Sequence, residues 1–167
     1  MIICKRSLTA DEIYLLQSIF SDSIDYNKVK IFALPIGSLK TAISLGGNIY
    51  FPKSYFSFDF SRENSSMQRW FIHEMVHVWQ SQRGFPVLLS GIFIFLCGGY
   101  IFHRAYQYIH KIQAHTSFNQ LNMEQQAEVI ADFFTTQNLR LKQQLYAVIL
   151  DFIKSAHRGN VLPRLFV

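Results

Sequence analysis

The sequence feature that most constrains the fold is residues 71–80, which contain the pattern His-Glu-x-x-His at positions 73–77. On an α-helix, residues four apart lie about one turn apart on the same face, so His73 and His77 can both direct an imidazole at one metal ion. Glu74 lies roughly 100° around the helix from His73, close enough to reach a water on that metal. Two imidazoles, a carboxylate from elsewhere and an open position describe a catalytic zinc site, with Glu74 as general base.

The neighbours of this polar trio are apolar, which predicts a helix buried on most sides. They are Ile72, Met75, Val76, Val78 and Trp79. The alternative is a helix that contains His and Glu by chance. Buried polar groups without partners are costly, and one metal ion would satisfy all three, so we favour the metal site.

The composition predicts a single domain over residues 1–167, long enough to bury a full core. Sixteen Phe and eight Tyr indicate an aromatic-rich core or a surface built to bind. The net charge is +5, but Lys and Arg are scattered without a basic run, so we expect no nucleic-acid partner. Cys4 and Cys97 are the only cysteines and form no C-x-x-C motif, so His and carboxylate groups must hold the zinc.

The N-terminal part predicts one helix followed by a small sheet. Thr9 and Glu12 have the spacing of a capping box, and the apolar pattern after them predicts a helix over residues 10–21. Alternating apolar residues and Gly/Pro turns predict the sheet. It comprises a strand over 26–34, a turn at 35–37, and a second strand or bulged hairpin at 42–51 around Gly46-Gly47.

The remaining pattern is helical. Ser65 or Ser66 is expected to cap the metal-motif helix, which runs to about Gln82. Asn122 and Gln125 form a second capping box, and a last helix is expected over 139–156, ending at Gly159. These elements predict a mostly helical α+β domain with a small sheet within residues 28–51.

Residues 87–102 form an apolar run in which Ser90 is the only polar side chain. The run is shorter than the roughly 20 residues that span a bilayer. A single crossing would also separate His77 from Glu124. We therefore expect the segment to be buried in the domain and the protein to purify without detergent, with membrane contact not favoured.

The later helix offers the third ligand. Glu124, Glu128 and Asp132 are spaced by four and form one acidic stripe, while Ala127 and Ala131 keep that side of the helix thin enough for close approach. A solvated acidic face is the alternative. Apolar residues elsewhere on this helix indicate burial, where the carboxylates need cations. Both Glu124 and Glu128 remain possible ligands on this reasoning.

The two motifs together resemble those of the gluzincin metallopeptidases, in which a later Glu is the third zinc ligand and an acid one turn on holds a ligand His. The chain is more similar to the zincin-like, Vgr-related domains linked to Rhs and VgrG proteins of bacterial type VI secretion. The likeness spans about residues 8–135 and rests on five stretches: 24–26, 48–51, 72–80, 122–127 and 132–134. The chain departs from that family in the unusually apolar segment 87–102.

The resemblance implies roles for the acidic stripe. The Glu that opens Glu-Gln-Gln-Ala is the family's candidate ligand, which favours Glu124 over Glu128. The local Glu-x-x-Ala-Asp pattern favours Glu128 instead, because it places Asp132 at the orienting position. We choose Glu124 as the third zinc ligand, with Glu128 or Asp132 orienting a ligand His.

The resemblance also implies a substrate and a route. Asn48, Ile49 and Tyr50 would form an edge strand that pairs with an extended peptide. The function implied is a zinc metallopeptidase effector that hydrolyses peptide bonds in a protein or cell-wall peptide, with a VgrG- or Rhs-like carrier or an immunity protein as partner. Residues 1–6 lack the apolar core of a signal peptide, so we expect synthesis in the cytoplasm without a cleaved leader and export by a specialised system into a target cell.

Two other classes of function remain open: a catalytically silent zinc module that docks on a secretion apparatus, and a membrane-active toxin that uses residues 87–102. Four further side chains are candidates for transition-state stabilisation, namely His103, Tyr106, Tyr108 and His115. Plain packing is favoured for each, because aromatic residues are abundant throughout.

Overall fold

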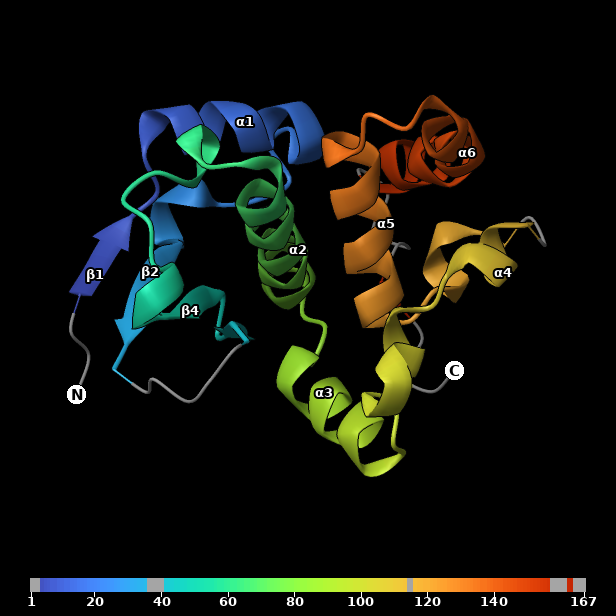
Figure 1. Cartoon of the computed structure of the whole chain (residues 1–167), viewed down its shortest axis with the longest axis horizontal. Coiled ribbons are helices and arrows are strands. Elements are labelled where there is room, and N and C mark those ends of the chain that lie inside the picture. The colour runs from blue at the N-terminus through green and yellow to red at the C-terminus, as the bar shows by residue number, and fades with distance from the viewer. Residues whose placement is uncertain (1–3, 36–40, 114–115, 157–161, 164–167) are drawn as a thin grey trace.

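The computed structural model describes residues 4–35, 41–113, 116–156 and 162–163. Its elements are α-helices, β-strands and short 3-10 helices, the last labelled η (Figure 1). In chain order they are β1 (Cys4–Ser7), α1 (Ala10–Phe20), η1 (Tyr26–Lys28), β2 (Lys30–Leu34), β3 (Ile43–Leu45), β4 (Asn48–Pro52), η2 (Lys53–Tyr55), η3 (Phe60–Arg62), α2 (Ser65–Gln82), α3 (Val87–Leu96), η4 (Ile101–Tyr106), α4 (Ile109–Gln113), η5 (Phe118–Gln120), α5 (Met123–Thr135) and α6 (Leu139–Ala156).

Helix α2 runs through the middle of the molecule, with the sheet on one side and α5 on the other (Figure 1). Helix α1 crosses one end, α6 packs on α5, and α3 with η4 forms a hairpin at the opposite end. The mostly helical α+β fold with one small sheet confirms the predicted fold class. Both predicted capping boxes are present, Thr9 with Glu12 and Asn122 with Gln125.

The sheet has four strands in the order β1-β2-β4-β3. Strand β2 pairs antiparallel with β1 and parallel with β4, and β3 pairs antiparallel with β4. Of the two alternatives expected at 42–51, a second strand or a bulged hairpin, the structure has a hairpin, and its three residue pairs follow one another without a bulge. Its turn uses Gly46 and Gly47 at φ +59° and +76°. Two consecutive positive φ angles are what a two-residue hairpin turn requires, and glycine adopts them without strain.

The expectation that Asn48, Ile49 and Tyr50 form an edge strand was wrong. They belong to β4, which has β2 on one side and β3 on the other. Ile49 is fully buried, and the Asn48 side chain accepts a hydrogen bond from the Lys30 backbone. The edge strands are β1 and β3. Strand β4 is internal because it pairs in parallel with β2, a long-range pairing that local alternation does not reveal.

Three local boundaries differ from expectation. The strand expected at 26–34 begins only at Lys30, because Tyr26–Lys28 forms the 3-10 helix η1. Strand β1 was not predicted. The cap of α2 is Asn64, whose side chain accepts from the backbone N–H of Ser66 and Met67, in place of Ser65 or Ser66. Residues 36–37 of the expected turn and the helix end at Gly159 lie outside the described residues.

The core is rich in aromatic rings on both sides of α2. On the sheet side, Phe60 stacks on Phe71 with ring centroids 4.9 Å apart. On the side of α6, Trp79 and Phe118 lie 5.4 and 5.0 Å from Phe152. All five rings are at most 1% exposed. Such pairs add to the free energy of burial, so the aromatic content anchors α2 in the centre of the fold.

The apolar segment 87–102 was expected to be buried in the domain, but much of it is exposed. Leu89, Phe95, Leu96 and Phe102 are 66%, 69%, 75% and 85% exposed, and Ser90 is the only buried residue of α3. The physical reason is topological: the hairpin of α3 and η4 projects from the end of the molecule and leaves one side without a partner (Figure 1).

No helix in the described part of the chain is by itself long and apolar enough to cross a membrane. Helix α3 together with the stretch Ile101–Gln113 reaches the required length and composition, but the pair bends by 116°.

One buried carboxylate ties the N-terminal elements together. Glu12 of α1 is fully buried and accepts hydrogen bonds from the Arg6 guanidinium of β1 at 2.7 and 2.8 Å. It also accepts from the backbone N–H of Thr9 and of Phe60. The carboxylate thus holds β1, α1 and η3 at one point.

We expect Glu12→Ala to lower the free energy of unfolding by about 3–5 kcal/mol, because it leaves the Arg6 charge and two N–H groups without their acceptor. Asp11→Ala is the matched control: the pair of Asp11 with Arg62 is exposed and should contribute about 0–1 kcal/mol. Urea denaturation measures both. Equal losses in the two variants would contradict this account.

Candidate metal centre

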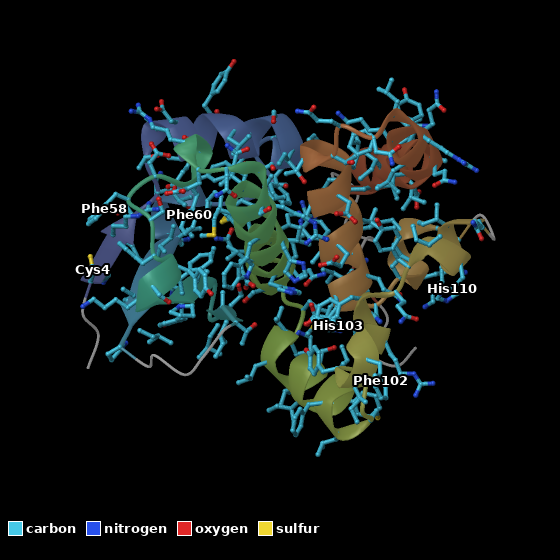
Figure 2. The ribbon with its side chains drawn as sticks, in the orientation of Figure 1. Cys4, Phe58, Phe60, Phe102, His103 and His110 are labelled. Carbon is cyan, nitrogen blue, oxygen red and sulfur yellow. The ribbon has the colours of Figure 1, made fainter. Side chains whose placement is uncertain are left out.

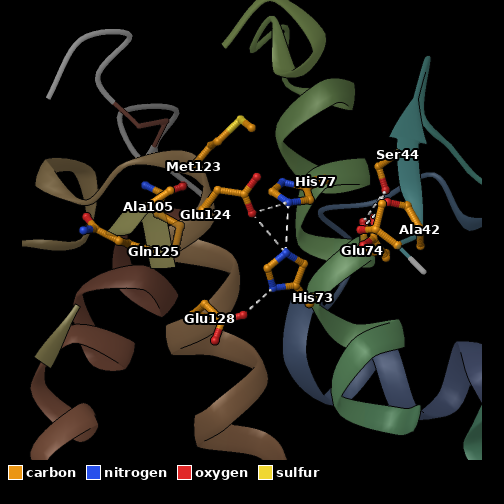
Figure 3. A network of polar contacts seen from close by, with 12 residues as sticks. Ala42, Ser44, His73, Glu74, His77, Ala105, Met123, Glu124, Gln125 and Glu128 are labelled. Carbon is orange, nitrogen blue, oxygen red and sulfur yellow. Dashed lines mark hydrogen bonds and ion pairs between the residues drawn. The ribbon is translucent and has the colours of Figure 1, made fainter. Parts of the chain in front are cut away.

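Three buried side chains from α2 and α5 converge on one point (Figure 3). The Nε2 atoms of His73 and His77 lie 3.2 Å apart. Oε2 of Glu124 lies 3.2 Å from the first and 3.3 Å from the second. The three residues are between 5% and 8% exposed. This buried His-His-Glu group could hold a metal ion.

Helix geometry explains how the three meet. His73 and His77 lie one turn apart on α2, as the motif predicts. Glu124 lies in the first turn of α5, just after the Asn122 cap, where the N-terminal end of a helix favours a negative charge. Ala127 is fully buried on the same helix, as a thin face against its neighbours requires.

The ring of His77 is fixed by a chain of amides. Gln80 donates through Nε2 to the backbone oxygen of Met123 and to Oε1 of Gln126, at 3.2 and 2.9 Å. Its own Oε1 therefore faces Nδ1 of His77, at 2.9 Å. Because Oε1 can only accept, Nδ1 must donate, and Nε2 of His77 is left facing the centre.

The ring of His73 is fixed by a carboxylate. Oε1 of Glu128 lies 3.0 Å from its Nδ1, and Glu128 is itself paired with the Arg69 guanidinium. Asp132 lies one step further out, where it accepts from Arg69 Nε at 2.6 Å and from the Tyr108 hydroxyl. Of the two candidate orienting residues, the structure thus brings Glu128 to a histidine and Asp132 to Arg69.

The chemistry of this arrangement fits a divalent cation. With both Nδ1 hydrogens donated outward, two imidazole lone pairs and a carboxylate oxygen face one another within 3.3 Å. Without a cation between them, a proton must take its place. Burial pushes the pKa of His73 down, yet hydrogen bonds to Glu124 and Glu128 raise it to about 10. Burial likewise pushes the pKa of Glu124 up, but the two histidines hold it far below its usual range.

The second oxygen of Glu124 also has a fixed partner. The Tyr100 hydroxyl donates to Oε1 at 2.8 Å, which leaves Oε2 for the centre. Burial and the nearby Glu124 charge raise the pKa of Tyr100, so the phenol stays protonated as a donor. Sequence reasoning did not find Tyr100, because nothing in the local pattern indicates that the apolar hairpin returns to α5.

Glu74 lies on another side of α2, toward the edge strand β3 (Figure 3). It is 4% exposed, and its Oε2 accepts from the Ser44 hydroxyl at 2.7 Å. Ser44 belongs to β3, so the edge strand and the glutamate of the motif are directly connected. Ser44 was also missed by sequence reasoning, whereas the Gln80 contact with His77 follows helix spacing and could have been found.

A cleft of about 940 Å³ joins these groups. Residues of β3, α2, α3 and α5 line it, including Ser44, Glu74 and Glu124. Among the other candidate side chains, His103 and Tyr106 line the cleft, and the Tyr106 ring lies 6.1 Å from that of His73. Tyr108 instead contacts Asp132 outside it, and His115 is not among the described residues.

The described lining of the cleft includes none of Asn48, Ile49 and Tyr50. The part of the sheet that borders it is Ile43 and Ser44 of the edge strand β3, together with Ala42 just before that strand. Any extended peptide in the cleft would therefore meet β3 and not β4.

Comparison with known proteins finds a similar protein in both sequence and structure. No model of a known protein family matches the chain. The chain is 34% identical over 141 residues to the type VI secretion system spike protein VgrG2b of Pseudomonas aeruginosa. The match covers 80% of this chain but spans only 13% of the length of that relative.

The fold is similar to the solved effector domain of P. aeruginosa VgrG2b. The TM-score is 0.67 at 30% identity, and the match covers 96% of this chain and 85% of that domain. The chain therefore belongs to the family of the VgrG2b effector domain, a type VI secretion effector domain.

Proposed function

We propose that this domain is a zinc-dependent peptidase that acts as a secreted effector. The observation that supports this most is the meeting of His73 Nε2, His77 Nε2 and Glu124 Oε2 at one point beside a cleft that also contains Glu74. Two imidazoles and one carboxylate match the ligand set of catalytic zinc sites in peptidases. When bound, zinc would supply a Lewis acid that polarises a carbonyl and acidifies water.

The other side chains have defined tasks in this proposal. Glu128 and Gln80 hold the rings of His73 and His77 by their Nδ1 atoms, and Tyr100 holds the outer oxygen of Glu124. Glu74 acts as general base: it takes a proton from the attacking water and passes it to the amine leaving group. The Ser44 hydroxyl keeps the Glu74 carboxylate at the wall of the cleft until substrate binds.

The substrate class is a peptide in extended form. Residues 42–44 form the cleft wall at the open edge of the sheet, where an extended peptide can add as a further strand. A protein segment or a cell-wall peptide both meet this requirement. The substrate-contacting role expected of Asn48, Ile49 and Tyr50 passes to β3.

The relative points to a route of delivery. VgrG2b is described as a secretion system spike protein, and the domain resembles its effector part. We propose a carrier of that kind as the partner during export and an immunity protein as the partner in the producing cell. A catalytically silent zinc module would need the same three ligands but would make no use of Glu74.

The assignment of the third ligand can be tested by zinc titration. Glu124→Ala removes the carboxylate at the centre, so we expect zinc affinity to fall by several orders of magnitude. Glu128→Ala leaves the three converging atoms in place and should cost only about 10–100-fold. The reverse order would make Glu128 the ligand.

The role of Glu74 can be tested separately from binding. Glu74→Gln should retain about one zinc per chain, while cleavage falls by two or more orders of magnitude. The loss is measured by mass spectrometry, which counts the new N-termini that appear in a target-cell extract treated with the unsubstituted protein and in the same extract treated with the variant. Loss of zinc would show that Glu74 is itself a ligand, and undiminished cleavage would remove the peptidase proposal.

Removal of the metal should make stability depend on pH in a defined direction. In the zinc-free protein, the pKa of His73 is raised from 6.5 to about 10, so its contribution is complete below pH 6.5 and is lost as pH rises toward 10. The same interaction lowers the pKa of Glu124, whose contribution is lost as pH falls below about 4.5. Both pKa shifts arise from the same interaction between His73 and Glu124, so its free energy is counted only once.

We therefore expect the zinc-free protein to be most stable at about pH 4.5–6.5 and to lose on the order of 2–5 kcal/mol by pH 10. Melting temperatures in the presence of a chelator measure this, and His73→Asn should remove the alkaline decline. A flat curve for the unsubstituted protein from pH 6.5 to 10 is the contrary result.

A further inference from the structure

The hairpin of α3 and η4 carries a continuous apolar surface that the rest of the domain does not cover. We define the α3 face as the seven exposed side chains Leu88, Leu89, Ile92, Phe95, Leu96, Ile101 and Phe102, which are 48–85% exposed. Monomeric proteins rarely leave this many large apolar groups together in water. The face is at the far end of the molecule from α1 and away from α6 (Figure 1), and among the described contacts α3 packs against the sheet chiefly at the edge strand β3.

The hairpin that carries this face has no acidic residue of its own, while Glu74, Glu124 and Glu128 lie in the cleft that Leu88, Ile92 and Phe95 border on one side of the face. All eleven Asp and Glu residues of the chain lie outside residues 75–123, the stretch that contains the hairpin. Arg104, His110 and Lys111 line a cavity of about 480 Å³ on the flank of α3, and its described lining contains no acidic side chain. Asn122 and Gln125 add amide groups to the wall. An apolar face on a hairpin whose charged side chains are all basic is complementary to a lipid surface with anionic headgroups.

We propose that the α3 face docks on the surface of an anionic phospholipid bilayer. Its apolar side chains enter the boundary between headgroups and acyl chains, while Arg104 and Lys111 contact lipid phosphates. The bend of 116° between α3 and Ile101–Gln113 suits a hairpin that lies in the interface, and exposed side chains of both arms can enter it together.

This docking sets the orientation of the cleft. Leu88, Ile92 and Phe95 belong to the α3 face and also line the cleft that contains the metal centre. A docked domain therefore opens its cleft along the lipid surface. The inference concerns the surface alone and holds whether or not the centre is catalytic.

Sedimentation with vesicles tests the proposal on the whole 167-residue chain. We expect the protein to sediment with phosphatidylcholine vesicles that contain about 30% phosphatidylglycerol, and about tenfold less with phosphatidylcholine alone. Protein that stays in the supernatant with the anionic vesicles would overturn the proposal.

The apolar contribution is tested by Leu96→Glu with Phe102→Asp. Both side chains are mostly exposed, and Phe102 has a φ of +54°, which Asp adopts more readily than Phe. We expect partitioning to fall at least tenfold. Phe58→Asp is the matched control, since Phe58 is 75% exposed like Leu96 but lies on the opposite side of the molecule (Figure 2). An equal loss in the control, or no loss in the double variant, would contradict the proposal.

The headgroup contribution is tested by Arg104→Gln and Lys111→Gln, with Lys53→Gln as the control outside the hairpin. Each of the first two should weaken binding to anionic vesicles about fivefold and the control should not. Inorganic phosphate at matched ionic strength should not release the protein; release would assign the cavity to free phosphate instead of lipid. Light scattering in the absence of vesicles tests whether a second copy of the chain binds the α3 face instead. A dimer that dissociates in the Leu96→Glu variant would assign the face to that second copy.

Discussion

The repulsion among three buried lone pairs is the constraint on which this structure depends. His73, His77 and Glu124 bring their donor atoms within 3.3 Å of one another at the place where α2 packs on α5. That packing is stable only if a cation or a proton lies between them. Because each donor is held from behind by a different residue, none of the three can rotate away without leaving a buried partner unsatisfied.

Helix α2 connects the two halves of the domain through different sides of one motif. Its histidines face α5, which supplies the carboxylate, and Glu74 faces β3, which supplies the Ser44 hydroxyl. The spacing within His-Glu-x-x-His therefore does more than place two candidate ligands. It separates the side of α2 that carries the histidines from the side that faces β3 by part of a helical turn, which places the edge of the sheet next to the proposed base.

The hairpin of α3 and η4 meets two opposite demands. On the inner side, Tyr100 reaches Glu124 and Tyr106 approaches His73, so the hairpin completes the wall of the metal centre. On the outer side, it leaves the α3 face in solvent. Two glycines allow the chain to reverse within this short distance. Gly98 has a φ of +69°, and a Cβ atom at Gly99 would lie only 2.6 Å from the Ile94 side chain. One short segment thus links the proposed lipid surface to the candidate metal centre.

The sequence by itself determined the features that depend on neighbours along the chain. The periodicity of α2, the spacing of His73 and His77, and the caps at Thr9 and Asn122 all follow from helix geometry, and they were predicted. The acidic stripe of α5 was also predicted, since it needs only a period of about 3.6 residues. Composition further indicated that the many aromatic rings had to fill a core or a binding surface, and the structure buries many of them in the core and leaves others, such as Phe95 and Phe102, exposed.

Tertiary structure decided everything that depends on which segments meet. A stripe of three carboxylates cannot reveal which one reaches the Nε2 atoms of both histidines, because that depends on the depth at which α5 crosses α2. Strand order cannot be deduced from alternation, so the edge passed from Asn48–Pro52 to Ile43–Leu45. The apolar segment 87–102 was expected inside because burial lowers free energy, but hydropathy carries no information on whether a partner surface exists. Only the path of the chain after Gly84 left that face without one.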